Sequence, residues 1–182
     1  MSRNRLITMS PTDHIIAQGA HGESALNAWL QKWQLSYVAI CQSPGTFSTL
    51  FPQHVKRPDF LLLIPSLGTI AVDAKNYTLS GGVYTLTLET ELRRSVAFER
   101  LFRMPLWYAY MDHEADGERW FWISALQAVE VGTVRKNSHS GDAFLSIPLS
   151  EFVQVETSAD LAKLYSQHLP GAAHIAALPL TL

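Results

Sequence analysis

Two neighbouring stretches decide how this chain folds: Arg57-Pro58-Asp59-Phe60-Leu61-Leu62-Leu63-Ile64 and, after a short turn, Thr69-Ile70-Ala71-Val72-Asp73-Ala74-Lys75. Both are short apolar runs bounded by turn residues, which is typical of consecutive β-strands. Side chains alternate between the two faces of a strand, so Asp73 and Lys75 share one face with Ala71. The predicted strand pair therefore carries one acid at its start and an acid and a lysine near its end.

These charged residues have the chemistry of a divalent-metal site. Asp59 and Asp73 offer carboxylate oxygens, the ligands that hard cations such as magnesium prefer, and Lys75 adds a fixed cation beside them. Such a charge arrangement suits phosphodiester cleavage. The competing interpretation of Asp73 is a structural ion pair with Lys75 or an arginine. Either role requires a nearby cation, because an isolated buried charge is costly.

The bulk composition fits one globular domain spanning residues 1–182. Hydrophobic residues make up 47% of the chain and charged residues 16%, as in globular rather than disordered proteins. The chain has one cysteine, Cys41, which excludes an intramolecular disulfide and favours a reducing compartment. No apolar run reaches the roughly 18 to 20 residues of a membrane span. We therefore expect a cytoplasmic protein with no membrane partner.

The charge is small in sum and uneven in distribution. The net charge of −2 argues against a protein that coats nucleic acid indiscriminately. Residues 1–111 contain 10 Lys/Arg against 7 Asp/Glu, whereas residues 112–182 contain 4 against 9. The first part of the chain therefore permits a basic groove without establishing one.

The pattern along the chain predicts an α/β domain with a mixed central sheet flanked by helices. A helix begins at Pro11 behind the cap residue Ser10. Two glycines on its apolar stripe, Gly19 and Gly22, imply that it closely approaches another element. Predicted strands cover 37–41, 60–64, 69–74, 83–88, an aromatic hairpin at 106–111 and 119–124, and 144–147; predicted helices cover 11–33, 89–104 and 158–168.

These features resemble the PD-(D/E)xK nuclease superfamily, which has the restriction-endonuclease-like fold. The resemblance rests on Pro58-Asp59, thirteen intervening residues, and Asp73-Ala74-Lys75. A helical glutamate upstream, Glu23, is similar to the first-helix acid of the Holliday-junction-resolvase-like members. The likeness covers residues 12–125 or so, as an ordered αβββαβ core, to which the rest adds a hairpin and a C-terminal helix. One departure is that the second acid is Asp rather than the more usual Glu.

The resemblance implies a metal-dependent nuclease that hydrolyses phosphodiester bonds in DNA with Mg²⁺ or Mn²⁺. Asp59 and Asp73 would be metal ligands, together with the backbone carbonyl of Ala74. Lys75 would orient the attacking water and neutralise developing charge, and Glu23 would assist catalysis. The resemblance also implies phosphate contacts from the second helix, for which the candidates are Arg93, Arg94, Arg100 and Arg103.

Other interpretations stay open. The arginines have a simpler role as partners of Glu89, Glu91 and Glu99 at helical spacing. Residues 135–141 form either an ordinary surface loop or a basic loop that contacts a nucleic-acid strand or flanks the site. The hairpin tryptophans either pack in the core or stack bases; they are Trp107, Trp120 and Trp122.

Three alternatives to the interpretation as a DNA nuclease also remain. One is a catalytically weak or inactive module of the same fold that binds nucleic acid or a protein, the second is a toxin nuclease, and the third is a plain structural domain. A homodimer is plausible because cutting two strands needs two sites, and an accessory protein is a further possible partner.

Overall fold

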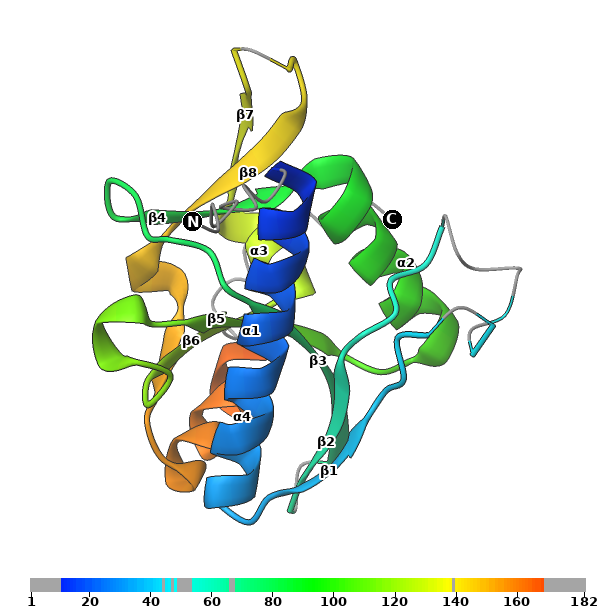
Figure 1. Cartoon of the computed structure of the whole chain (residues 1–182), viewed down its shortest axis with the longest axis vertical. Helices are drawn as coiled ribbons and strands as arrows, with labels where there is room; N and C mark the ends of the chain where they lie inside the picture. Colours follow the sequence, from blue (N-terminus) through cyan, green and yellow to red (C-terminus); the bar gives the residue numbers. More distant parts are fainter. Residues whose placement is uncertain are drawn as a thin grey trace, which may run out of the picture.

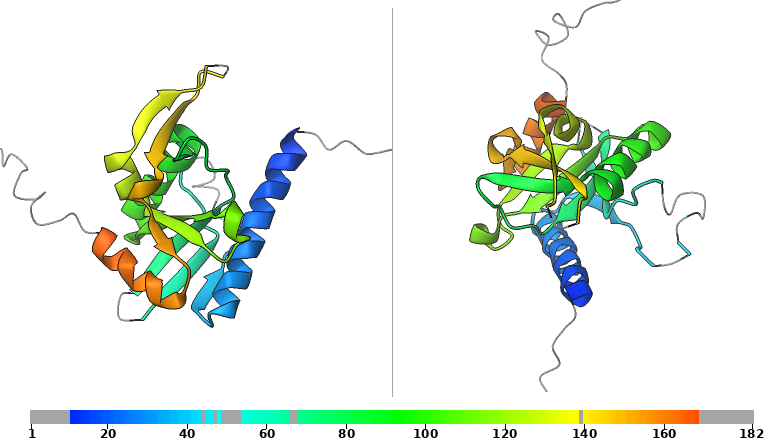
Figure 2. Two further views of the ribbon diagram at one scale, coloured as in Figure 1. Left: turned by 90° about the vertical axis from the view of Figure 1, so that its left-hand side faces the viewer. Right: turned by 90° about the horizontal axis from the view of Figure 1, so that it is seen from above.

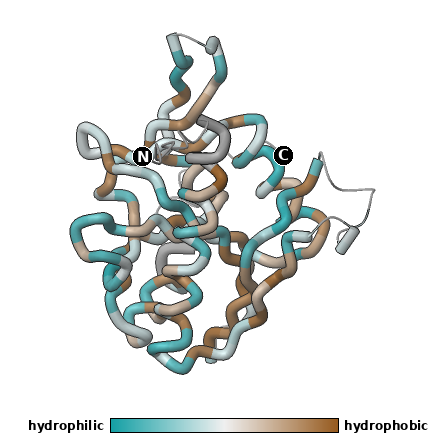
Figure 3. Tube along the Cα trace, viewed as in Figure 1, coloured by the Kyte–Doolittle hydropathy of each residue, from teal (hydrophilic) through white to brown (hydrophobic). Residues whose placement is uncertain are grey.

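The two stretches predicted as strands form a hairpin at the centre of the structure. The computed structural model describes residues 11–43, 45–46, 48, 54–65, 68–138 and 140–168. In it, β2 (Phe60–Ile64) pairs antiparallel with β3 (Gly68–Lys75), which places Phe60 opposite Val72. Hydrophobic residues run along both strands (Figure 3). Both predicted strands are thus confirmed.

The hairpin is extended on both sides into a six-stranded mixed sheet (Figure 1). On one side, β1 (Ser36–Ala39) pairs antiparallel with β2. On the other, β5 (Leu106–Met111) lies parallel to β3, as expected when the crossover contains a helix, here α2 (Arg93–Phe102). The antiparallel strands β6 (Trp120–Ser124) and β9 (Val153–Val155) complete the order β1-β2-β3-β5-β6-β9.

A second sheet of three strands departs from the sequence prediction. Its order is β4-β8-β7, all antiparallel. β4 (Val83–Thr87) and β8 (Ala143–Pro148) were expected as strands, but of one common sheet. β7 (Thr133–Lys136) falls partly within the stretch predicted as loop. All four of its residues are exposed, so they carry no alternation of apolar and polar side chains.

The helices differ from the prediction mainly at their ends. α1 (Pro11–Lys32) matches its predicted span closely. The helix predicted for 89–104 begins as a π-helical turn, Leu88–Leu92, continues as α2, and ends where Arg103 adopts a left-handed conformation (φ 54°). The short helix α3 (Ala125–Val131) was not predicted. The C-terminal segment consists of a 3₁₀ turn, Ser158–Ala162, followed by α4 (Lys163–His168). None of the described helices combines the length and apolarity that crossing a membrane requires.

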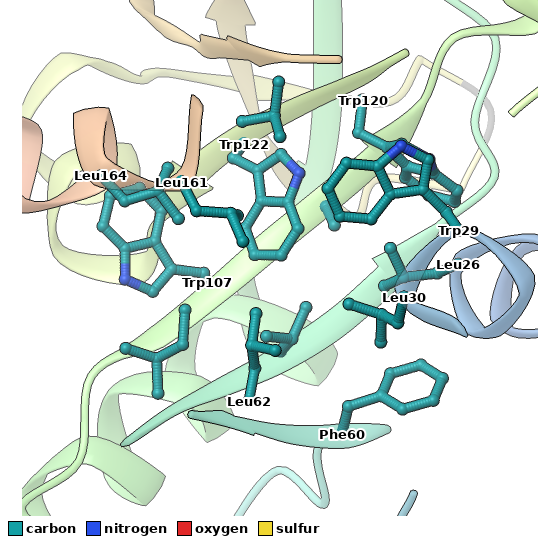
Figure 4. Close-up of a cluster of buried hydrophobic side chains, with 14 of the residues drawn as sticks. Leu26, Trp29, Leu30, Phe60, Leu62, Trp107, Trp120, Trp122, Leu161 and Leu164 are labelled. Carbon is teal, nitrogen blue, oxygen red and sulfur yellow. The ribbon is translucent and has the colours of Figure 1, made fainter. Parts of the chain in front are cut away.

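The large sheet carries a hydrophobic core on each face. On one face, Leu26, Trp29 and Leu30 of α1 pack with side chains of the sheet and of the C-terminal helical segment (Figure 4). On the other face, α2, α3 and the small sheet pack around Tyr108 and Tyr110 of β5. The three hairpin tryptophans are buried in the first core. They therefore pack rather than stack bases, which excludes the second of the two roles considered for them.

One of the two glycines of α1 is indeed at a close approach. A Cβ built on Gly22 would lie 2.8 Å from the Cβ of Asn76, the residue after β3, whereas one built on Gly19 meets nothing within 4 Å. The side chain of Asn76 donates to the carbonyl of Gln18 at 2.8 Å. Gly22 therefore sets how closely α1 approaches the end of β3, and the same expectation for Gly19 was wrong.

This difference predicts opposite effects of two alanine substitutions. Gly22→Ala should lower the free energy of unfolding by about 1–3 kcal/mol, because the added methyl group has to displace Asn76. Gly19→Ala should raise it by up to about 1 kcal/mol, because alanine favours the helix and the site is open. Urea denaturation of both variants measures the two changes. Equal effects of the two substitutions would show that α1 does not touch the strand end at Gly22.

Candidate metal and catalytic site

The start of β2 holds Asp59 beside the end of β3. The register of the two strands begins at Phe60, opposite Val72, and the N–H of Asp59 also donates to the carbonyl of Val72 at 2.9 Å. Asp59 therefore lies just outside the paired positions, beside the end of β3. Its Oδ2 also accepts from the N–H of Ala74 at 2.8 Å. These two hydrogen bonds therefore hold Asp59 next to the strand end that carries Asp73.

Asp73 is buried between two lysines. Its Oδ1 lies 2.9 Å from Nζ of Lys56, and its Oδ2 lies 2.7 Å from Nζ of Lys75. Glu91, in the π-helical turn before α2, is ion-paired with both: its Oε2 contacts Nζ of Lys75 and lies 3.1 Å from Nζ of Lys56. We call Lys56, Asp73, Lys75 and Glu91 the quartet. It contains two positive and two negative groups and is therefore balanced in charge.

The quartet fixes the ionisation of its members. Burial on its own disfavours the charged form of Asp73, but Lys56 and Lys75 outweigh it and lower the pKa of this carboxyl to about 2. Burial likewise works against the charged form of each lysine. The nearby carboxylates again win, led in both cases by Asp73, and they raise the pKa values of Lys56 and Lys75 above the ordinary lysine value. All three groups are charged at neutral pH.

Two further carboxyl groups next to the quartet behave in the opposite way. Burial, followed by the negative charges of Asp73 and Glu23, raises the pKa of Asp59 to about 8. Burial and Asp73 also raise the pKa of Glu23, which is half-buried on α1. Glu23, Asp59 and Asp73 therefore lie close enough to oppose one another's ionisation. The structure thus brings the predicted Glu23 to the same place as the strand acids.

The donor set fits a divalent cation, although its oxygens are engaged elsewhere. In the described part of the chain, no three His, Cys, Asp or Glu side chains already form a metal-ligand arrangement. Both oxygens of Asp73 face ammonium groups instead. The three carboxyl groups, however, make one another's ionisation more costly, and a bound cation relieves that cost. The N–H of Ala74 points toward Asp59, and in an extended strand its carbonyl points to the same side.

The four predicted arginines do not converge on the quartet. Arg93 forms an exposed ion pair with Glu89 at 2.5 Å, one helical turn away, which confirms the simpler role for this residue. Arg94 is half-buried, and its carbonyl accepts from the backbone N–H of Lys56 at 3.0 Å. Arg100 and Arg103 are exposed, about 14 and 18 Å along the helix axis from Glu91 at 1.5 Å per residue.

The expectation that Glu91 and Glu99 pair with arginines of this helix was wrong. Glu99 accepts from the backbone N–H of Leu106 at 2.8 Å, and Glu91 is ion-paired with the lysines of the quartet.

Three residues of the site were missed in the sequence. Lys56 and Glu91 complete the quartet, and Gln42 donates to the carbonyl of Pro58 at 3.0 Å and to Oδ1 of Asp59 at 3.4 Å. Lys56 lies three residues before Asp59, which was the one signal available for it. Glu91 belongs to a charged run that looked like a solvated helix face, and nothing in the spacing of Gln42 sets it apart.

Comparisons with known proteins add no relative to this description. No protein-family model matches the sequence, no curated protein matches it, and no solved structure matches the fold. Any function assigned to the chain therefore has to be argued from the site itself.

The opposite ionisation of the two aspartates predicts opposite effects of two isosteric substitutions. In the absence of divalent cations, Asp59→Asn should be more stable than the wild type at about pH 9, because asparagine resembles the neutral carboxyl that the fold prefers. Asp73→Asn should lose about 3–5 kcal/mol of unfolding free energy at pH 7, because it leaves buried lysines without their partner. Urea denaturation with EDTA present measures both.

The free energy of unfolding depends on pH in opposite directions through Asp59 and Asp73. The folded pKa of Asp59 lies above its ordinary value, so the stability that it contributes is complete below about pH 4 and lost as pH rises through about 8. The folded pKa of Asp73 lies below its ordinary value, so its contribution is complete above about pH 4 and lost as pH falls toward 2. A wild-type stability that rises between pH 6 and 9 and an Asp59→Asn variant weaker than wild type at pH 9 would refute this assignment.

Proposed function

We propose that this protein is a metal-dependent nuclease with a restriction-endonuclease-like core that hydrolyses phosphodiester bonds in DNA. The observation that carries the proposal is the convergence of Asp59, Asp73 and Lys75 at one end of the central hairpin, with Glu23 beside them. Along the large sheet and its helices the order is α1-β1-β2-β3-α2-β5, with β4 between β3 and α2 set aside because it belongs to the small sheet; with β5 parallel to β3, this supports the fold assignment because it is the αβββαβ order of that core. The exposed thiol of Cys41 suits a reducing, cytoplasmic environment.

The residues that would hold an Mg²⁺ or Mn²⁺ ion are Asp59, Asp73 and the carbonyl of Ala74, with Glu23 nearby. When bound, such an ion supplies Lewis-acid polarisation of a phosphoryl oxygen and stabilises the leaving oxygen. Asp59 has to give up its proton to act as a ligand, because its pKa is raised to about 8 without a cation. Asp73 is already ionised, and it would have to give up one of its two lysine partners to act as a ligand.

Lys75 acts in this proposal through its charge and not as a base. Its raised pKa keeps the ammonium group protonated at neutral pH, so it has no lone pair with which to accept a proton. Asp73 and Glu91 fix the position of its Nζ, and the ring of Tyr108 lies 5.7 Å away. A protonated lysine held in this way orients a water molecule and offsets negative charge that develops on the phosphate.

Lys56 gives the site a second cation that the resemblance does not supply. Its Nζ bridges Asp73 and Glu91 across the quartet. With a cation at Asp73, Lys56 would keep Glu91 as a partner and could contact a phosphate oxygen of the substrate. In this proposal the role of Lys56 is to neutralise negative charge at the site, that of Asp73 and that of the substrate phosphate.

One observation favours a second candidate, a catalytically weak or inactive module of the same fold that binds nucleic acid or a protein partner. The quartet is balanced in charge without a metal ion, since each oxygen of Asp73 already has an ammonium partner. Such a site is self-sufficient as a structural ion-pair network. The carboxyl groups of Asp59 and Glu23, which the quartet does not neutralise, weigh against this candidate.

The test is a cleavage assay on circular single-stranded, supercoiled duplex and branched DNA in magnesium and in manganese. The wild type should cut at least one of the three, and Asp73→Ala and Lys75→Ala should lose at least a hundredfold in rate. Lys32→Ala is the matched control, because Lys32 is an exposed lysine at the end of α1 with an ion pair to Glu118. It should cut like the wild type.

Circular dichroism checks that each variant is folded, so that a lost rate reports on chemistry. A folded wild type that cuts none of the three DNAs in either metal, or a Lys75→Ala variant that keeps the wild-type rate, would overturn the nuclease assignment. DNA binding that persists without cleavage would establish the second candidate in its place.

A further inference from the structure

A pocket of about 380 Å³ lies between the small sheet and the segment that follows β3. The β7–β8 hairpin, which supplies part of the lining, projects from the body of the molecule in Figure 1 and in the left view of Figure 2. β4, which pairs with β8 in the same sheet, adds the neighbouring part of the lining, and Tyr77 comes from the segment that follows β3. The residues used below are Tyr77, Thr85, Thr87, Asn137, Asp142 and Phe144.

The pocket is continuous with the candidate site through two short connections. Tyr77 follows Lys75 by two residues, and the Nζ of Lys75 lies 5.8 Å from the centroid of its ring. Thr87 ends β4 and immediately precedes the π-helical turn that carries Glu91. When a phosphate of the substrate lies next to Lys75, the adjoining nucleotide is therefore within reach of this pocket.

The lining combines aromatic surface with hydrogen-bonding groups of both kinds. The rings of Tyr77 and Phe144 offer flat apolar faces, while Thr85, Asn137 and Asp142 provide hydroxyl, amide and carboxylate groups. A nucleobase has the same combination, a flat face that stacks on aromatic rings and an edge with donors and acceptors. The volume also falls in the range of small-molecule sites, about 300–1,000 Å³.

We propose that this pocket binds an unpaired nucleobase next to the scissile phosphate, so that the substrate is single-stranded or locally unpaired DNA. The proposal rests on the proposed nuclease function and deepens it. A base in a duplex has both faces stacked and its pairing edge occupied, so it has to leave the stack before it enters such a pocket. A strand that is already unpaired avoids that cost.

The hairpin also provides positive charge for the strand that would carry this base. Arg135 and Lys136 of β7 are exposed and pair with Phe144 and Ala143 of β8, two residues of the pocket lining. Because successive side chains of a strand alternate between its faces, Arg135 shares the face of Phe144, and an arginine in this position suits a phosphate group beside a bound base. Arg135 thus acquires a role in the proposal, as a contact for the strand that carries the base.

The experiment measures binding of a fluorescein-labelled oligothymidylate by fluorescence anisotropy, with calcium in place of magnesium. Tyr77→Ala should weaken binding about tenfold or more, since stacking of a base on an aromatic ring contributes about 1–3 kcal/mol and 1.4 kcal/mol is tenfold. Tyr77→Phe keeps the ring and should bind like the wild type. Tyr165→Ala, which removes an exposed tyrosine from α4, is the matched control and should have no effect.

A second variant keeps the test decisive if Tyr77→Ala is poorly folded. Thr85→Trp places a large side chain in the pocket from the exposed face of β4, where aromatic residues favour the strand, and should also weaken oligothymidylate binding tenfold or more. The same oligothymidylate annealed to its complement should bind more weakly than the single strand. Wild-type affinity in both pocket variants, or a duplex bound as tightly as the single strand, would overturn the proposal.

The outcomes separate this proposal from the nuclease assignment. Tyr77-dependent binding by a protein that cuts no DNA supports the pocket and refutes the nuclease. Cleavage by the wild type with unchanged binding and cutting in Tyr77→Ala and Thr85→Trp refutes the pocket alone.

Discussion

The structure depends on the neutralisation of Asp73 by two lysines at the end of the central hairpin. A carboxylate at this position, 2% exposed and in the middle of a sheet, is tolerated only with cations at contact distance. Lys75 comes from the same strand, but Lys56 comes from the preceding loop and Glu91 from the turn before α2. The ion pairs therefore tie two other segments of the chain to one strand end.

The same arrangement leaves the site unbalanced just outside the quartet. Asp59 and Glu23 add two carboxyl groups for which the quartet has no spare cation, and both respond by holding their protons more tightly. Gly22 permits this crowding, because it lets α1 approach Asn76 and brings Glu23 to the strand end. Acids that are arranged to oppose one another's ionisation are characteristic of functional sites, because a fold gains no stability from them.

The sequence predicted those parts of the molecule that depend on local periodicity. Strand alternation was enough to put Asp73 and Lys75 on one face, and the succession of two short strands was enough to put Asp59 one strand away from them. Lys56 and Glu91 were beyond such reasoning, because one lies in a loop and the other in a π-helical turn. Their approach to Asp73 is a result of tertiary packing. The small sheet was not predicted for a related reason. β7 is short, polar and exposed, and its pairing with β8 is visible only in three dimensions.

The most direct test of the account is a crystal structure of the wild type soaked in Mn²⁺, with anomalous diffraction used to locate the ion. The account predicts an anomalous peak at bonding distance from the carboxylates of Asp59 and Asp73 and the carbonyl of Ala74, with Lys56 displaced from Oδ1 of Asp73 and Lys75 still on Oδ2. An intact quartet with no peak beside it, in crystals that take up manganese elsewhere, would contradict the claim that this cluster of charges is a metal site.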